Sequence, residues 1–354
     1  MRIVSLATSI VLASACLFRA EAASDSRGFV NVADFAPSDG SADASDTIQR
    51  LIDENPHRTL WFADGTYLLS KPIATPADPQ RSVDLQLSNY AILKAAPDWT
   101  NTTAMVLLGG SHPANNIYAV GSVYSLTGGI IDGGGVAAGV SIESGRETKV
   151  RNVSMKFVTI GLHIRRGVNA GSSDCDISDV NIVGNRRPGS VGVVIEGSDN
   201  TLSNMRIAGV QTGVRIAGFG NLMTNIHPLY SNPMDQYAES VAFHDLGRNN
   251  FYDRCESDHF STGWRFTRDW CHAVLTGCLA VWYAPTPGHR HTAIRCDGIF
   301  TAHVSDMTIT WCKAEAVNTV LEVGKDGGNG YLRDLIMDER LVNEEQKTYR
   351  DYLR

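Results

Sequence analysis

The sequence has little positive charge and few lysines. Its 354 residues carry 31 Lys and Arg against 38 Asp and Glu, which gives a net charge of −7. Proteins that bind nucleic acids present a basic face to the phosphates, so this balance argues against a nucleic-acid partner. Beyond residue 22 the chain also lacks an apolar run long enough to cross a bilayer, and we expect no membrane partner.

The first 22 residues have the pattern of an export signal. Arg2 precedes an apolar run, Ile3–Phe18, and Ala20-Glu21-Ala22 forms an A-x-A cleavage site. Cys16 offers an alternative lipoprotein site. We predict that residues 1–22 are removed and that the protein is secreted or periplasmic.

One short pattern recurs eight times after residue 150: two turn-forming residues, an apolar anchor, any residue, and a second apolar or small residue. The steps between anchors are 27, 25, 21, 29, 23, 29 and 28 residues. Strand-length units at this period, each with an apolar stripe that it cannot bury alone, are typical of a β-solenoid. The predicted inward ladder consists of Val153, Val180, Met205, Ile226, Cys255, Cys278, Met307 and Leu335.

Six cysteines remain after the predicted cleavage, and an even number in an exported chain permits disulfides. However, Cys255 and Cys278 both occupy the anchor position of adjacent repeats. We therefore favour buried thiols in the core over disulfide bridges.

The segment before the repeats suggests a cap for the open end of the coil. It contains a short strand near Val30–Phe35, a helix over Asp43–Asn55 and a strand-turn-strand sequence from Thr59 to Tyr67. Its sequences VNVADFAPSDGSADASDTIQRLID and LWFADGTYLLSKPI, together with LTGGIIDGGG at Leu126–Gly135, resemble the rhamnogalacturonase/epimerase-like group of the pectate-lyase superfamily.

The resemblance implies an all-β fold, a right-handed single-stranded parallel β-helix with a short N-terminal capping helix, and action on an extracellular carbohydrate. We expect the N-terminal cap at 23–75, the rungs of the β-helix at 76–337 and a C-terminal cap or tail at 338–354. The signatures lie in the cap and core, so they specify the fold more than the reaction.

The register identifies the side chains that face outward. Alternate residues of a strand face solvent, so the position after each anchor forms an outward column: Ser154, Asn181, Arg206, His227, Glu256, Leu279, Thr308 and Ile336. Glu256 and His227 are consecutive in it. Asp258 and His259 follow on the same strand, and two long turns, Pro228–Ser240 and Trp282–Thr292, leave the coil on this side.

Aromatic rings beside carboxylates suit a sugar, which has an apolar face and many hydroxyls. We therefore predict a cleft whose catalytic residues are Glu256, Asp258, His227 and His259. The predicted substrate-binding residues around it are Arg206, Tyr230, Asp235, Glu239, Trp282 and Tyr283. The simpler interpretation is that each charged residue merely solvates an exposed sheet.

A second surface runs along the later strand of each rung. Arg215 and His244 are its candidate substrate-binding residues, in a line with His163, Arg265 and Arg295. Such a line could hold an acidic polysaccharide or could simply balance the acidic surface. Gly213–Ile216 resembles the G-x-R-I-K strand of polygalacturonase-type hydrolases, but their paired-aspartate and G-H-G motifs are missing from the rungs where they should fall.

No cofactor is predicted. His289-Arg290-His291 lacks a third ligand at a spacing typical of zinc sites. Carboxylates of Asp235, Glu239, Glu256 and Asp258 could bind Ca²⁺ if they converged, but no loop motif fixes that geometry.

The leading hypothesis is a secreted enzyme that cleaves a glycosidic bond in a polysaccharide or oligosaccharide, with Glu256 and Asp258 sharing the acid and the nucleophile or base roles. One alternative is a polysaccharide lyase acting on a uronic-acid polymer, in which Arg206 neutralises the carboxylate and His227, His259 or Tyr230 takes the proton. The other is a non-catalytic glycan-binding or adhesive β-helix.

The lysine content favours hydrolysis over elimination. The chain has 7 Lys, none in the predicted cleft, and lysine is a common base in polysaccharide lyases of this kind. The sequence leaves the sugar and the oligomeric state open.

Overall fold

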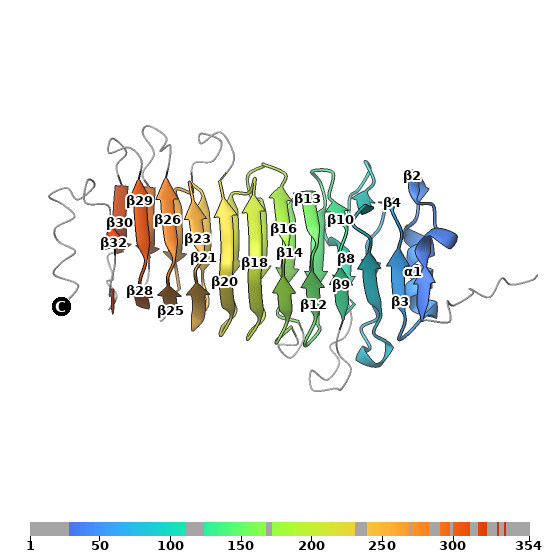
Figure 1. The fold of residues 1–354 in the computed structure, drawn as a ribbon, viewed down its shortest axis with the longest axis horizontal. Helices are drawn as coiled ribbons and strands as arrows, with labels where there is room; N and C mark the ends of the chain where they lie inside the picture. Colours follow the sequence, from blue (N-terminus) through green and yellow to red (C-terminus); the bar gives the residue numbers. More distant parts are fainter. Residues whose placement is uncertain are drawn as a thin grey trace, which may run out of the picture.

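The computed structural model describes residues 28–110, 124–167, 172–230, 239–268, 271–282, 291–297, 300–311, 318–323, 331–332 and 336–337. Within these residues the chain winds into an elongated parallel β-helix with three faces (Figure 1). Every strand pairing in it is between parallel strands of successive rungs. The predicted all-β solenoid is therefore confirmed.

The first and second faces form one continuous sheet, and two long strands, β18 (Thr201–Ala208) and β20 (Leu222–Leu229), run through both. The other strands of the first face are β1 (Phe29–Asn31), β3 (Thr59–Phe62), β6 (Asp84–Leu87), β9 (Ser125–Thr127), β12 (Lys149–Arg151), β15 (Asp176–Ser178), β22 (Asn250–Asp253), β25 (Cys271–Thr276), β28 (Phe300–Ser305) and β31 (Tyr331–Leu332).

The second face carries the candidate cleft. Its other strands are β2 (Asp39–Asp43), β4 (Gly65–Leu69), β7 (Ala91–Ala95), β10 (Ile130–Asp132), β13 (Ser154–Val158), β16 (Asn181–Gly184), β23 (Glu256–Asp258), β26 (Leu279–Trp282), β29 (Thr308–Trp311) and β32 (Ile336–Met337).

The third face is a separate sheet. Its strands are β5 (Ile73–Ala74), β8 (Ala104–Leu108), β11 (Ala138–Ile142), β14 (Ile160–Ile164), β17 (Val191–Ile195), β19 (Thr212–Ile216), β21 (Val241–Asp245), β24 (Thr262–Phe266), β27 (His291–Cys296) and β30 (Asn318–Val323).

The two turn-forming residues of each repeat make the bend between the first and second faces. The second of the two has a left-handed backbone, with φ between 50° and 60°, at Asn152, Asp179, Asn204, Asn225, Arg254, Gly277 and Asp306. Gly, Asn and Asp tolerate this region best, which explains why they recur there. A single left-handed residue turns the chain sharply, and the next residue, the anchor, then points into the coil.

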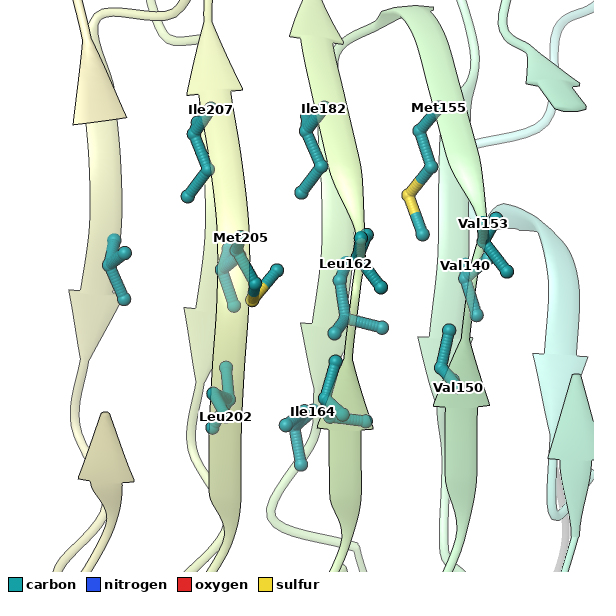
Figure 2. Close-up of a cluster of buried hydrophobic side chains, with 14 of the residues drawn as sticks. Val140, Val150, Val153, Met155, Leu162, Ile164, Ile182, Leu202, Met205 and Ile207 are labelled. Atoms are coloured by element: carbon teal, nitrogen blue, oxygen red, sulfur yellow. The ribbon is translucent and has the colours of Figure 1, made fainter. Parts of the chain in front are cut away.

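The anchors are buried as predicted. Val153, Val180, Met205, Ile226, Cys255, Cys278 and Met307 are all at most 1% exposed, while Leu335 lies outside the described residues. Figure 2 shows how Val153, Met205 and residues of facing strands such as Leu162 fill the interior between the faces. The side chains of successive rungs stack, which buries a continuous apolar core that no single rung could form.

Cys255 and Cys278 are free thiols within this core, as predicted, and so are Cys175, Cys271 and Cys296. Burial raises the pKa of Cys175 to about 12 and that of Cys255 well above its ordinary value. Cys312 lies outside the described residues. The five described thiols are therefore structural core residues.

The N-terminal segment differs from the prediction in one respect. The expected helix is present as α1 (Ser45–Glu54), with Ile48, Leu51 and Ile52 buried, and it lies at the N-terminal end of the coil in Figure 1. However, β1 already pairs with β3, and β2 with β4, so parallel rungs begin at Phe29 inside the predicted cap of 23–75. Short 3-10 turns occupy Val32–Asp34 and Pro79–Arg81.

The predicted signal, 1–22, and the tail, 338–354, lie outside the described residues. In the described part of the chain, no helix has the length and apolar character needed to span a membrane.

Candidate functional site

The outward column of the second face is confirmed by the strand register. Ser154 pairs with Asn181, Asn181 with Arg206, Arg206 with His227, and Leu279 with Thr308. Because Leu229 pairs with Asp258, His227 and Glu256 fall on consecutive rungs. The β-helix thus brings together residues that are 29 and 31 positions apart in the sequence.

His227 lies between the two carboxylates. Its Nε2 is 3.5 Å from Oε1 of Glu256 and 3.6 Å from Oδ2 of Asp258. This nitrogen is buried and makes no hydrogen bond within the described residues, since both contacts are longer than a hydrogen bond. His227 therefore lies within ion-pair distance of both carboxylates without a hydrogen bond to either.

Asp258 is the most constrained of the three. Its other oxygen, Oδ1, faces Nδ1 of His259 in a short contact. Burial of Asp258 by itself would raise its pKa, but the imidazoles of His227 and His259 on either side outweigh that effect and lower the pKa to about 2. Asp258 is therefore ionised throughout the neutral range.

Glu256 is the more accessible carboxylate. Its side chain is 29% exposed, against 10% for Asp258. Ser257, between them, points into the core and is fully buried. The alternation of β23 thus directs both acids to the same side, where Glu256 is the one that a ligand meets first.

His259 adopts a left-handed backbone, with φ of 62°. This conformation costs free energy for a non-glycine residue, and residues that adopt it often lie in functional sites. The bend directs the imidazole back toward Asp258, and it also ends the alternation that the sequence pattern assumed.

Two of the predicted aromatic residues face the core instead of the cleft. Trp282 is fully buried and donates from Nε1 to the carbonyl oxygen of Phe260 at 2.7 Å. Tyr230 is 6% exposed, and its ring centre lies 5.4 Å from that of Phe260. Tyr230 lies two residues after the buried Pro228, and Trp282 lies two residues after the buried Ala280. By the alternation of a strand both rings therefore point into the coil and provide no exposed platform for a sugar.

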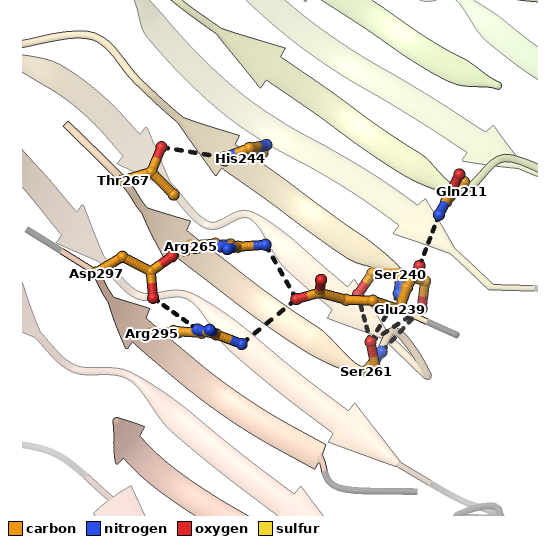
Figure 3. Close-up of polar contacts among 9 residues, drawn as sticks. All are labelled: Gln211, Glu239, Ser240, His244, Ser261, Arg265, Thr267, Arg295 and Asp297. Carbon is orange, nitrogen blue, oxygen red and sulfur yellow. Dashed lines mark hydrogen bonds and ion pairs between the residues drawn. The ribbon is translucent and has the colours of Figure 1, made fainter. Parts of the chain in front are cut away.

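Glu239 also lies elsewhere than predicted. It reaches the third face, where its Oε1 contacts Arg265 at 3.0 Å and Arg295 at 3.5 Å (Figure 3). Asp297 binds the same two arginines, at 2.7 Å each. The arginines attract Glu239 to the third face and away from the cleft.

Of the remaining predicted residues, Arg206 lies at the cleft and His291 lies in the core. Arg206 is exposed beside His227, and its guanidinium donates to the carbonyl oxygen of Met205 at 3.3 Å. Asp235 and Tyr283 lie outside the described residues, as does His289. His291 is 2% exposed, with its ring centre 5.8 Å from that of Trp282, so it belongs to the core.

The line on the third face exists as predicted: His163, Val194, Arg215, His244, Arg265 and Arg295 occupy successive rungs. Burial and the neighbouring charges of Arg265 and Arg215 lower the pKa of His244 to about 4, so it is neutral at neutral pH. Glu239 and Asp297 pair with Arg265 and Arg295, whereas Arg215, which is exposed, makes no ion pair with a described residue. The line is thus largely neutralised within the protein, which favours the cleft on the second face.

The cluster has the chemistry of a metal site as well as that of an acid–base pair. One ligand atom from each of His227, Glu256 and Asp258 lies within 4.8 Å of the others. Imidazole nitrogen with two carboxylate oxygens is a donor set that suits several divalent ions. A Ca²⁺ site built from Asp235, Glu239, Glu256 and Asp258 would require Glu239 to lie at this cluster. Glu239 instead binds arginines on the third face.

Comparisons with known proteins agree with the architecture. The search of curated protein sequences gave no match. Among solved structures, gene product 12 of bacteriophage phi29 is similar with a TM-score of 0.68 and 12% identity, over 87% of this chain and 45% of that one. The alginate lyase of Paenibacillus sp. str. FPU-7 gives 0.53 and 14%, over 82% and 96%.

A double mutant of the tailspike protein of E. coli bacteriophage HK620 gives a TM-score of 0.56 and 12% identity, over 89% of this chain and 66% of the tailspike. The chain thus spans less than two thirds of the length of either phage protein. At these identities the similarity establishes the fold alone.

The family comparison is more specific. The model of a family described as rhamnogalacturonase A/epimerase, pectate lyase-like, matches residues 29–232, which is more than half of the chain. The match includes the N-terminal segment whose motifs carried the resemblance, and it extends to His227. The chain therefore belongs to the rhamnogalacturonase A/epimerase, pectate lyase-like family.

Proposed function

We propose that this protein is a polysaccharide-acting enzyme that cleaves a glycosidic bond at the cluster of His227, Glu256, Asp258 and His259. The observation that carries the proposal is the pairing of an ionised, buried carboxylate with an accessible one across a histidine. Two carboxyl groups in different environments are the requirement of glycoside hydrolysis. Family membership supports a carbohydrate substrate, as do two structural neighbours: the alginate lyase and the HK620 tailspike, which also has a structure in complex with a pentasaccharide.

The roles follow from the environments of the two acids. Asp258, with its pKa of about 2, cannot donate a proton at neutral pH. It supplies the negative charge that faces the oxocarbenium-like transition state, and it holds His227 and His259 in position. Glu256, the more accessible member, protonates the leaving oxygen while Asp258 bonds to the anomeric carbon. Glu256 then takes a proton from the water that hydrolyses this glycosyl-enzyme and frees Asp258.

The separation of the two acids favours retention of configuration. One carboxylate oxygen of Glu256 and one of Asp258 lie within 4.8 Å of each other. Retaining enzymes have carboxyl groups about 5 Å apart, whereas inverting enzymes need roughly 6.5–9.5 Å to admit a water molecule. We therefore expect the product to keep the anomeric configuration of the substrate.

A lyase is the second candidate, because the contact between Asp258 and His259 resembles the orientation of a catalytic histidine by a carboxylate. In that case a histidine removes the proton α to a uronate carboxylate. Export across the inner membrane, predicted from residues 1–22, would bring either enzyme to extracellular polysaccharides.

The test begins with a panel of plant, algal and microbial polysaccharides. New reducing ends without ultraviolet absorbance from an unsaturated uronate indicate hydrolysis, and the appearance of that absorbance indicates elimination. On the identified substrate, Glu256→Gln should fold normally and lose about 10²-fold or more in turnover. Thr308→Ala, farther along the same outward column, is the matched control and should keep full activity. A Glu256→Gln variant with wild-type turnover would refute the assignment.

A further inference from the structure

A hollow of about 450 Å³ lies on another edge of the β-helix, where the third face turns into the first face of the next rung. Phe219, Arg166, Arg268 and Glu196 line it, and Gly197 and Gly218 are among the residues of its floor. None of these residues belongs to the cleft, which opens on the second face. Sequence reasoning overlooked the hollow because its residues come from irregular turns outside the strand repeats.

The floor is rigid because the turns of successive rungs are in direct contact. A Cβ atom on Gly218 would lie 1.7 Å from the carbonyl oxygen of Gly197, and a Cβ on Gly197 would lie 2.1 Å from that of Ser172. Only glycine permits this approach. The turns beneath the hollow are therefore stacked in backbone contact, with no side chain at these two positions.

A buried row of asparagines holds the same turns from below. The side chain of Asn200 donates to Oδ1 of Asn221 at 2.9 Å, and the side chain of Asn221 donates to Oδ1 of Asn250 at 3.1 Å. All three residues are at most 1% exposed. Because each amide is fixed by its neighbour, the hollow is preformed and a ligand would not need to order it.

Phe219 presents an exposed aromatic ring at this hollow. Its relative exposure is 54%, among the largest of the described apolar residues, although it is anchored by backbone pairing with Arg248. A lone exposed ring is ordinary, but this one lines a hollow together with Gly197 and Gly218. That arrangement suits the apolar face of a sugar ring, with hydroxyls directed to the peptide groups.

The charge of the hollow identifies the sugar. Arg166 and Arg268 are both exposed. Arg166 makes no side-chain ion pair within the described ranges, and Arg268 donates only a long hydrogen bond, 3.4 Å, to the carbonyl oxygen of Leu246. The one acid of the lining, Glu196, lies 3.4 Å from Nε2 of His163. Two guanidiniums thus outnumber one carboxylate in a protein whose net charge is −7.

We propose that this hollow is an ancillary binding site for a uronic-acid residue of a polysaccharide. Phe219 stacks on the sugar ring, and Arg166 and Arg268 bind its carboxylate through charge-assisted hydrogen bonds. A second site on the same rigid molecule raises the effective concentration of the polymer at the cleft. The site does not depend on the reaction proposed for Glu256 and Asp258.

The test compares trigalacturonate with a galactose trisaccharide of the same linkage, which lacks only the carboxylates, by isothermal titration calorimetry on the full chain. Wild type should bind the acidic trisaccharide at least about 10-fold more tightly. Phe219→Ala and the double variant Arg166→Gln/Arg268→Gln should each weaken that binding about 10-fold or more, with unchanged circular dichroism. Phe251→Ala, an exposed phenylalanine on the first face outside the hollow, is the matched control and should bind like wild type.

Three outcomes would overturn the proposal: no binding of trigalacturonate by wild type, equal affinity for the neutral trisaccharide, or wild-type affinity in both hollow variants. Glu256→Gln separates the two sites. If it lowers turnover but not trigalacturonate affinity, both proposals stand. If it keeps turnover while Phe219→Ala still loses affinity, the cleft assignment fails and the ancillary site remains. If only Glu256→Gln weakens binding, uronate binds at the cleft and the ancillary site is refuted.

Discussion

Replacement of Asp258 by asparagine tests the electrostatics of the cleft through stability alone. The side chain keeps its shape, but the negative charge that His227 and His259 stabilise is removed. The pKa of Asp258 is about 2 in the folded protein, against an ordinary value of 3.8. Such a difference corresponds to about 2 kcal/mol of folding free energy at neutral pH.

The sign of the effect gives it a distinctive pH dependence. A carboxyl whose folded pKa is lowered contributes its full stabilisation above its unfolded pKa and loses it as the pH falls through the folded value. The contribution of Asp258 should therefore be constant from neutral pH down to about pH 5 and shrink to roughly half at pH 3.

Urea unfolding of wild type and Asp258→Asn at pH 7, 5 and 3 measures this difference. Asp253→Asn, an exposed aspartate two residues before Cys255 on the same rung, is the control and should change stability by less than about 0.5 kcal/mol at every pH. We expect wild type to be more stable than Asp258→Asn at neutral pH. If the difference in their free energies of unfolding stays the same from pH 7 to pH 3, or if the variant is the more stable, Asp258 is not ionised as proposed.

Three further changes test the core, the turns and the cofactor prediction. Ile226→Asp should cost well over about 3 kcal/mol in urea unfolding, because it buries an unpaired charge at a fully buried position; a soluble variant of normal stability would contradict the inward register. Asn221→Ala removes an amide that bonds both Asn200 and Asn250 and should cost more than about 3 kcal/mol, whereas Asn181→Ala, at an exposed strand position, should be nearly neutral by the same measurement. Dialysis against a chelator should leave turnover unchanged if the carboxylates act as acid and base; loss of activity that a divalent ion restores would instead assign the cluster a metal.

The sequence by itself determined the fold and the register. The repeat places a left-handed residue, Asn, Asp or Gly in all described copies except Arg254, before each apolar anchor. This local requirement together with the alternation of the strand specifies which residues point inward. The burial of Ile226 and Cys255, and the placement of His227 beside Glu256 and Asp258, followed from that pattern. The N-terminal boundary of the coil did not, since the early rungs have irregular strands that pair as the later ones do.

Only the tertiary structure decided what happens where the strands end. At the strand ends Tyr230 packs against Phe260 and Trp282 donates to its carbonyl oxygen, so both rings stay in the core. Glu239 joins Arg265 and Arg295, which come from later rungs, because long-range charge attraction acts across elements that the sequence separates. The hollow beside Phe219 likewise arises from backbone contact between glycine turns of successive rungs, and this contact exists only once the rungs are stacked.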